Sequence, residues 1–246
     1  MAPPVALVTG ASRGIGRACA LALAHSGFDI AAHYNANTAE AGTLVAEASL
    51  PGRRAQSFSA NLSLAGAAKG LVEAVANSFG PPTVLVHCAG LMVEKPLSFT
   101  SPADWDSQFE LHAFSAAALS QALLRYVRKS EHGRIVYISS LAAVSGLGNG
   151  AAYAASKGAL TGLCKSLALE AARWKTTVNC IAPGYITTDM TAAHDDERRE
   201  ANIAKIPLGR YGTPEDVAGL VAYLCSRQAS WITGQTIVMD GGMSLG

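Results

Sequence analysis

Tyr153 and Lys157 are the residues of this 246-residue chain whose types and spacing first suggest chemistry. On an α-helix, residues four positions apart lie one turn apart on the same face, so this pair would place a phenol beside an ammonium. A neighbouring cation lowers the pKa of a phenol, which ordinarily lies near about 10. The pair is therefore predicted to donate a proton near neutral pH, although the same spacing often occurs by chance on a solvated helix face.

Ser140 is the third residue of this candidate site. It follows the apolar run 134–138, which is typical of a buried strand, so its hydroxyl is expected where a strand ends and a loop begins. The segment 152–172 is predicted to be the helix that carries Tyr153 and Lys157. Its first turns are rich in Ala, Ser and Gly, so a cofactor or another helix can come close.

The elements that must position these residues alternate regularly along the chain. Predicted strands cover 5–8, 28–33, 54–59, 84–87, 134–139, 177–181 and 235–239. Predicted helices cover 17–25, 38–50, 63–79, 102–128, 152–172 and 214–225, with Ser63 as an N-cap and Pro81-Pro82 as punctuation before a strand. This alternation predicts an α/β fold, a doubly wound (Rossmann) parallel sheet of about seven strands with helices on both faces. Without repeats or linkers, residues 1–246 are predicted to form a single domain.

A glycine-rich turn follows the first predicted strand. Residues 9–16 read TGASRGIG, and helical spacing begins directly after them. Gly10 would permit the tight turn, while Gly14 and Gly16 would let the backbone approach a diphosphate at the helix N-terminus. The spacing is GxxxGxG rather than GxGxxG, so the turn predicts a dinucleotide site through its position at the first strand–helix junction.

The end of the second predicted strand bears on which dinucleotide binds. An acidic residue there would bind the ribose hydroxyls of NAD, but the chain has His33, Tyr34 and Asn35. Arg13 adds a cation that suits a 2′-phosphate, so NADP(H) is favoured over NAD(H), with Asn35 among the cofactor contacts. The alternative is that Arg13 only faces solvent and that His33 is a surface residue.

Composition limits the classes of partner. The formal charge is +1 without a long basic run, which argues against nucleic acid. Five cysteines occur without a CxxC pair, so neither a metal site nor a disulfide frame is indicated, and buried reduced thiols are expected. No apolar run reaches the roughly 18 residues that a membrane helix needs, and no charged leader is present. We therefore expect a soluble cytoplasmic protein.

Six short motifs occur in order along nearly the whole chain. They are TGASRGIG (9–16), CAG (88–90), ISS (138–140), YAASK (153–157), PG (183–184) and DGG (240–242). Together they resemble the short-chain dehydrogenase/reductase family. The segments PLGRYGTPEDVA (207–218) and ITGQTIVMDGG (232–242) look most like β-ketoacyl-[acyl-carrier-protein] reductases, although many sugar, steroid and small-alcohol dehydrogenases share them.

This resemblance implies roles for the matching positions. Tyr153 would protonate the carbonyl oxygen as hydride arrives from the nicotinamide, and Ser140 would donate a hydrogen bond to the same oxygen. Lys157 would lower the pKa of Tyr153 and bind the nicotinamide ribose. The other implied NADP(H) contacts are Gly10, Ser12, Arg13, Gly14, Ile15, Gly16, Asn61, Leu62, Ala89, Gly90, Pro183, Gly184, Ile186 and Thr188. No metal is needed, because the cofactor supplies the hydride.

Two positions depart from the family's pattern. His112 stands where the family usually has an Asn that holds a water relaying protons to the lysine. An imidazole can donate and accept, so His112 is predicted as a fourth catalytic residue; alternatively it is a packing residue in a weakened enzyme. Cys88 replaces the usual Asn of an NAG motif, so we expect a lost hydrogen bond between strands and a local cost in stability.

The function that the resemblance implies is NADPH-dependent reduction of a 3-oxoacyl thioester to the 3-hydroxyacyl product, in fatty-acid or polyketide-like biosynthesis. The acyl group would be carried by acyl-carrier protein or coenzyme A. A basic group near predicted helix ends could meet an acidic carrier, and it comprises Arg128, Lys129, Arg173 and Lys175. The alternatives are a reductase of another ketone or secondary alcohol, and a weakly active NADP-binding subunit of a hetero-oligomer.

Two further expectations concern assembly and motion. The resemblance implies a homotetramer, with interfaces formed by the helices that begin at 102 and 152 and by the final strand. The segment 189–205 is charged in its second half, which is typical of a solvated helix face and compatible with a mobile lid over the substrate.

Overall fold

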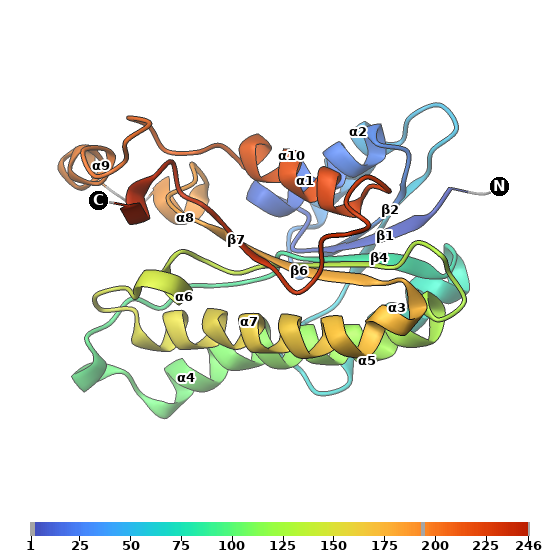
Figure 1. The fold of residues 1–246 in the computed structure, drawn as a ribbon, viewed down its shortest axis with the longest axis horizontal. Coiled ribbons are helices and arrows are strands. Elements are labelled where there is room, and N and C mark those ends of the chain that lie inside the picture. Colours follow the sequence, from blue (N-terminus) through green and yellow to red (C-terminus); the bar gives the residue numbers. More distant parts are fainter. Residues whose placement is uncertain (1–2, 193–194, 246) are drawn as a thin grey trace.

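Seven parallel strands form one sheet at the centre of the computed structural model, which describes residues 3–192 and 195–245. The strand order is β3-β2-β1-β4-β5-β6-β7 (Figure 1). The strands are β1 (Val5–Thr9), β2 (Asp29–Tyr34), β3 (Ala55–Ser59), β4 (Pro82–His87), β5 (Arg134–Ile138), β6 (Thr177–Pro183) and β7 (Thr236–Met239). The order reverses between β1 and β4, which creates the crevice where ligands bind in open α/β sheets. The predicted doubly wound fold is confirmed.

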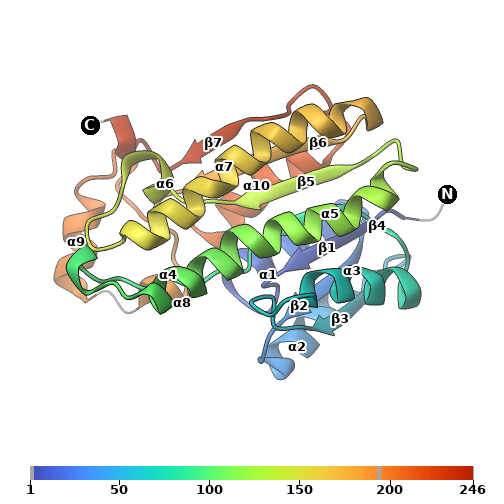
Figure 2. The same cartoon turned by 90° about the horizontal axis from the view of Figure 1, so that it is seen from below.

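Helices cover both faces of the sheet (Figures 1 and 2). One face carries α1 (Gly14–His25), α2 (Thr38–Ala48) and α10 (Pro214–Cys225). The other carries α3 (Ala67–Ser78), α5 (Ser115–Val127) and α7 (Ala151–Ala171), and α4 (Pro102–Phe109) packs beside α7. Every residue of β1, β5 and β6 is buried, as expected for parallel strands that are covered on both sides.

Three short helices lie at the end of the molecule toward which the strands point (Figure 1). They are α6 (Ala142–Ser145), α8 (Asp189–Ala192) and α9 (Asp196–Ile203). The charged segment 189–205 therefore contains two short helices, and its residues 193–194 lie outside the described chain. Right-handed crossovers bring all strand carboxyl ends to this edge, where open α/β sheets bind ligands, and of the three helices α8 contributes residues to the cavity there.

The predicted helix over 102–128 is interrupted. Between α4 and α5 the turn Glu110–Phe114 is a π-helix, a local widening that is often found at functional sites. His112 lies in this turn, and both flanking helices are regular. The sequence pattern did not reveal the interruption, because helical spacing of apolar residues continues across it.

Two predicted boundaries are wrong. Ser63 is not an N-cap: α3 begins only at Ala67, after Gly66 in the left-handed region at φ 80°. The Asn61 side chain instead accepts a hydrogen bond from the Ser63 backbone N–H at 3.1 Å, which favours a turn before the helix. Pro82 is the first residue of β4, a position where a missing N–H is tolerated. Among the described residues, no helix is long and apolar enough to cross a membrane.

Candidate active site

A cavity of about 820 Å³ opens at the carboxyl ends of the central strands. Ser140, Tyr153 and Lys157 line it together with every predicted cofactor contact. These contacts are Gly10, Ser12, Arg13, Gly14, Ile15, Gly16, Asn35, Asn61, Leu62, Ala89, Gly90, Pro183, Gly184, Ile186 and Thr188. His112 is the one predicted site residue that does not line the cavity. The fold therefore gathers residues from positions 10 to 188 around one space.

The glycine turn is packed tightly against the strand ends. Gly10 adopts a φ of 64°, and a Cβ there would lie 3.0 Å from the backbone of Ala89. A Cβ at Gly16 would collide with the Gly10 carbonyl oxygen, so only glycine allows α1 to start this close to β1. The N-terminus of α1 has no side-chain cap, which leaves backbone N–H groups facing the cavity.

The side chain of His33 is hydrogen-bonded to this glycine turn. Its Nδ1 accepts a hydrogen bond from the Gly10 N–H at 3.2 Å, and its Nε2–H donates to the Ala60 carbonyl at 2.9 Å. The side chain is buried, so the interpretation of His33 as a surface residue is wrong. Burial lowers the pKa of His33, which keeps the ring neutral. In the sequence, only the position of His33 at the end of a predicted buried strand indicated that it supports the turn.

Tyr153 and Lys157 lie in the first two turns of α7, and both are buried. The Lys157 Nζ is 6.0 Å from the centroid of the Tyr153 ring and donates a hydrogen bond to the Ile138 carbonyl at 2.8 Å. Ser139, directly after β5, donates to the Lys157 carbonyl at 2.9 Å, and the Ser140 hydroxyl interacts with Tyr153 closely enough to lower the pKa of its phenol. The β5–α6 junction therefore fixes all three candidate catalytic side chains.

The electrostatics of this trio differ from the expectation. Burial raises the pKa of Tyr153, and the hydrogen bond from Ser140 offsets part of that rise. Burial lowers the pKa of Lys157 to about 8, so the ammonium persists at neutral pH. Lys157 thus does not bring the pKa of Tyr153 below its ordinary value; burial outweighs it, and the ammonium donates to the Ile138 carbonyl.

His112 is fully buried in the π-turn and has a partner on each ring nitrogen. The Leu91 N–H donates to Nε2 at 3.0 Å, so Nδ1 carries the hydrogen and donates to Ser156 Oγ at 2.8 Å. Ser156 in turn donates to the Tyr153 carbonyl at 2.9 Å. Burial and the nearby Lys157 charge lower the pKa of His112 to about 2, so the ring is neutral. This geometry positions the loop after β4 and leaves neither nitrogen free for a relay.

His87 forms a second buried contact that the sequence did not single out. Its Nδ1 accepts from the Thr9 hydroxyl at 2.9 Å, and its Nε2–H faces Ser115 Oγ at 3.3 Å. The same Thr9 oxygen accepts the N–H groups of Cys88 and Ala89, each at 3.1 Å. Burial lowers the pKa of His87 to about 3. The ends of β1 and β4 are therefore tied together directly beneath the cavity.

Two ion pairs connect the segment after β6 to the rim of the cavity. Arg13 Nη1 lies 3.2 Å from Asp189 Oδ2, and both side chains are largely exposed. Arg198 lies 2.9 Å from a carboxylate oxygen of Glu94 in the loop after β4. Exposed pairs of this kind contribute little stability, about 0–1 kcal/mol each, so both can be exchanged for other partners.

Three comparisons relate the chain to known proteins. The profile of a family described as enoyl-(acyl carrier protein) reductase matches residues 10–244. The chain is 38% identical over 239 residues to the 3-oxoacyl-[acyl-carrier-protein] reductase FabG of Vibrio cholerae, covering 97% of this chain and 96% of that protein. The structure of a Serratia marcescens short-chain dehydrogenase/reductase mutant superposes with a TM-score of 0.92 at 33% identity and covers 98% of each chain.

The chain belongs to the short-chain dehydrogenase/reductase family. It is therefore an oxidoreductase that acts on a CH–OH or C=O group. The acetoin dehydrogenase YohF of Salmonella typhimurium is another similar structure, with 35% identity, a TM-score of 0.90, and coverage of 99% of this chain and 98% of that one. Reductases and dehydrogenases with different substrates thus share this fold and much of this sequence.

Membership in the short-chain dehydrogenase/reductase family implies a nicotinamide cofactor, and the cavity fits one. The uncapped N-terminus of α1 offers backbone donors for a diphosphate, and Gly10 and Gly16 leave no side chain in the way. A Cβ at Gly90 would lie 3.0 Å from His112 Nε2 and 3.3 Å from Lys157 Nζ, so only a glycine fits here without crowding these two groups. Within the described part of the chain, His, Cys, Asp and Glu side chains form no group that could hold a metal ion.

The trio contains the groups that an acid–base step on a carbonyl or alcohol requires. When bound, the nicotinamide donates or accepts the hydride. The Tyr153 hydroxyl can give a proton to the carbonyl oxygen that becomes an alcohol, and Ser140 can donate a second hydrogen bond to that oxygen. Lys157 places a positive charge in the same cavity, which favours the phenolate left after proton transfer.

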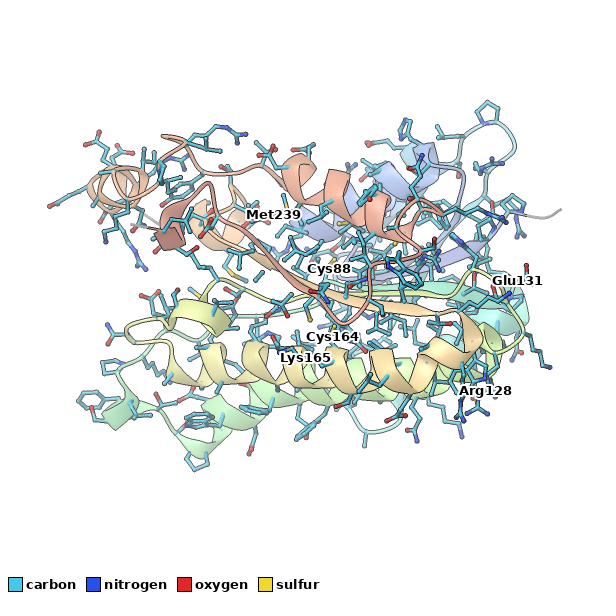
Figure 3. The ribbon with its side chains drawn as sticks, viewed as in Figure 1. Cys88, Arg128, Glu131, Cys164, Lys165 and Met239 are labelled. Carbon is cyan, nitrogen blue, oxygen red and sulfur yellow. The ribbon has the colours of Figure 1, made fainter. Side chains whose placement is uncertain are left out.

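The basic group at the helix ends lies far from this site. Arg128 and Arg173 both stack on the Trp174 ring, and Lys175 is 3.7 Å from Glu131. Tyr153 lies near the start of α7 and the basic group lies beyond its end, and the 21 residues of this helix span about 30 Å. Figure 3 shows Arg128 and Glu131 at one end of the molecule, while Met239, the last residue of β7, lies nearer its middle. Within one chain this group cannot guide a carrier into the cavity.

Proposed function

We propose that the protein reduces a 3-oxoacyl thioester to the 3-hydroxyacyl product with NADPH. The observation that carries the proposal is the Ser140–Tyr153–Lys157 trio in a cavity that also contains the glycine turn. The 38% identity to proteins named 3-oxoacyl-[acyl-carrier-protein] reductase, over nearly the full length of both chains, supports this substrate class.

NADPH is favoured over NADH by the charges around the adenosine end of the cavity. Arg13 lines this end, and the last residues of β2 and the one that follows contribute His33, Tyr34 and Asn35 without a carboxylate. The Arg13 guanidinium is paired with Asp189 in an exposed contact. A 2′-phosphate can take the place of this carboxylate and form stronger, charge-assisted hydrogen bonds with the guanidinium.

Acyl-carrier protein and coenzyme A would both deliver the thioester. The basic group of Arg128, Lys129, Arg173 and Lys175 would serve a carrier only if a second copy packed its helices antiparallel and brought this end beside Tyr153. We propose such a homotetramer. Exposed apolar side chains lie on both expected interfaces: Phe114 between α4 and α5, Trp231 before β7, and Val238 in β7. The expectation of a cytoplasmic location stays a prediction.

A small hydroxyketone or diketone is the second candidate substrate. The similarity to two structures titled acetoin dehydrogenase, at 35% and 37% identity, favours it. The third possibility is a weakly active NADP-binding subunit, and the neutral, fully bonded His112 is the feature that supports it.

The decisive experiment compares kcat/KM for NADPH oxidation with acetoacetyl thioesters of acyl-carrier protein and of coenzyme A, and with acetoin and diacetyl. We expect the thioesters to exceed the small ketones by at least about tenfold, equivalent to about 1.4 kcal/mol of transition-state binding. Tyr153→Phe is the control for enzyme-dependent turnover. Preference for acetoin or diacetyl would replace the first proposal with the second, and no turnover of any substrate would favour the weakly active subunit.

A further inference from the structure

Three polar side chains on successive turns of α4 and the π-turn hold the loop that follows β4. They are Asp104, Gln108 and His112, and their spacing of four residues places them along one side of the helix. Their partners are every second residue of the segment 91–95, taken in the opposite chain direction: Lys95, Val93 and Leu91. Together the three contacts form a loop ladder.

The contacts of the loop ladder run from the surface into the core. The Lys95 ammonium donates to both carboxylate oxygens of Asp104, at 2.8 and 2.9 Å, where both groups reach solvent. The Val93 N–H donates to Gln108 Oε1 at 3.3 Å, and the Gln108 side chain is fully buried. Because every second residue of the segment takes part, a shift by one residue would break all three contacts together. The loop ladder therefore sets the register of the loop against α4.

Gln108 is the centre of this arrangement. Burying a side-chain amide costs free energy unless its polar atoms are hydrogen-bonded. Gln108 has a partner at each end, since Oε1 accepts from Val93 and Nε2–H donates to the Asp104 carbonyl at 3.3 Å. Asp104 is fixed in turn by the capping box of α4, where its carboxylate accepts the Ser101 N–H at 2.9 Å. The rigid start of α4 is thus connected to a segment that has no regular secondary structure of its own.

The segment 91–95 forms part of the cavity wall beside the candidate catalytic trio. It begins directly after Gly90, where a Cβ would lie 3.3 Å from Lys157 Nζ. Leu91 and Met92 both line the cavity. Neither is among the expected cofactor contacts, so they belong to the part of the cavity that a carbonyl substrate can occupy.

The same segment is connected to the opposite rim of the cavity. Glu94 accepts two hydrogen bonds from the Arg198 guanidinium of α9, at 2.9 and 3.1 Å. In Figure 1, α9 lies above the sheet and α4 below it, toward the same end of the molecule. The segment 91–95 therefore joins the two, and its position against α4 also determines where Glu94 meets α9.

We propose that the loop ladder determines the size of the carbonyl substrate, with Gln108 as the residue that positions the segment 91–95 and Met92 as the residue that limits the space beside Tyr153. The inference rests on carbonyl reduction in this cavity, as in the proposed function, but not on a thioester as the substrate. Methionine is unbranched and adaptable, so Met92 can set a size limit only where the backbone that carries it is held in place. The bonded N–H of Val93, the next residue, supplies that constraint.

Met92→Ala tests the size limit with paired substrates that differ only in chain length. The pairs are the 3-oxooctanoyl and acetoacetyl thioesters of coenzyme A, or 2,3-hexanedione and diacetyl if diketones are the better substrates. The ratio of kcat/KM for the longer member to kcat/KM for the shorter should rise at least about tenfold. The shortened side chain makes room for additional CH₂ groups, each worth about fourfold when buried. NADPH affinity should stay unchanged, and an unchanged ratio would refute the role of Met92.

Gln108→Met tests the positioning role, because it keeps the side-chain volume but removes the acceptor of the Val93 N–H. Hydrogen exchange, followed by mass spectrometry on peptides that contain 91–95, should become at least about tenfold faster for one amide. KM for the carbonyl substrate should rise about three- to tenfold with little change in kcat. The length ratio should move in the same direction as in Met92→Ala. In the double variant the ratio should match that of Met92→Ala alone, since a displaced Met92 no longer limits the space.

Ser107→Ala is the matched control. Its hydroxyl donates to the same Asp104 carbonyl at 3.0 Å but is not part of the loop ladder, so exchange and the length ratio should keep their wild-type values. If Gln108→Met does not fold, Lys95→Ala breaks the exposed contact and should shift the ratio in the same direction by about two- to fivefold.

Two results would overturn the proposal. Unchanged exchange in Gln108→Met would show that Gln108 does not hold the segment, and independent effects of the two substitutions in the double variant would show that it does not act through Met92. If no carbonyl compound were turned over, the proposed function would fail, whereas the exchange measurement would still decide whether Gln108 positions the segment 91–95.

Discussion

The Nδ1 of His112 lies 2.8 Å from the hydroxyl of Ser156, one residue before Lys157 in α7. Together with the Leu91 N–H on Nε2, this contact fixes a neutral imidazole between α7, the π-turn and the loop after β4. A residue predicted to relay protons thus occupies the position of a structural bridge. The stability and the kcat of His112 variants can distinguish this bridging role from a catalytic one.

His112→Ala should lower the free energy of unfolding by about 2–4 kcal/mol, because it empties a buried volume and leaves the Leu91 N–H without its acceptor. Ser156→Ala removes only one side of the bridge and should cost about 1 kcal/mol. Urea unfolding curves measure both. If His112→Ala left stability unchanged while kcat fell, the relay hypothesis would replace the bridging one.

Acid should destabilise the fold well above the pKa values of its carboxylates. His87 and His112 have pKa values lowered to about 3 and 2, so they stay neutral in the folded protein, while the unfolded chain takes up protons below about 6.5. The unfolded state then binds more protons, and stability falls by about 1.4 kcal/mol per pH unit for each histidine as the pH drops toward about 4.5. The lowered pKa of His33 acts in the same direction.

Unfolding midpoints between pH 7 and 4.5 test this acid sensitivity. His112→Gln should make the slope shallower by the contribution of one histidine, whatever its effect on stability at neutral pH. Asp104 and Asp216, whose pKa values are lowered from 3.8 to about 2, give a contribution to stability that is present above about pH 3.8 and is lost only as the pH falls from there toward about 2. A pH-independent midpoint in this range would contradict the burial of neutral histidines.

Tyr153→Phe should reduce kcat by about 10²–10⁴-fold, because it removes the proton donor while the ring still fills its place. Binding of NADPH, followed by fluorescence, should change little. Ser140→Ala should also lower kcat, and it should move the alkaline limb of the reduction profile to higher pH. The sign follows from the hydrogen bond from Ser140, which lowers the pKa of Tyr153 and is lost in the variant. An alkaline limb that moved to lower pH would exclude Tyr153 as the titrating acid.

Arg13→Ala should weaken NADPH binding by about 10- to 100-fold, the loss expected for one or two charge-assisted hydrogen bonds, and should leave NADH binding nearly unchanged. Arg17→Ala is the matched control: Arg17 lies in the first turn of α1, which begins directly after Arg13, but pairs with Glu47 at 2.8 Å, outside the cavity lining. Equal losses for the two cofactors in Arg13→Ala would refute the assignment of Arg13 to a 2′-phosphate.

Local patterns in the chain were sufficient for the fold and for most of the candidate site. Apolar runs separated by amphipathic segments predict a parallel sheet, and in such a sheet the connections place every strand end on one edge. That rule alone brings Gly10, Ala89, Ser140 and Pro183 together from distant parts of the sequence. Tyr153 and Lys157 follow because helix geometry fixes the relation of residues four positions apart.

Interactions between elements were decided only by the tertiary structure. The apolar pattern of 102–128 continues across the π-turn, so nothing in it revealed that His112 faces Ser156 and Leu91. The pKa of Tyr153 depends on burial and on where the Lys157 ammonium points, and neither is encoded in their spacing. The distance of the basic helix ends from Tyr153 likewise requires the packed fold. Periodicity specifies which face of an element is buried, whereas hydrogen bonds and charges depend on distances across the core that only packing determines.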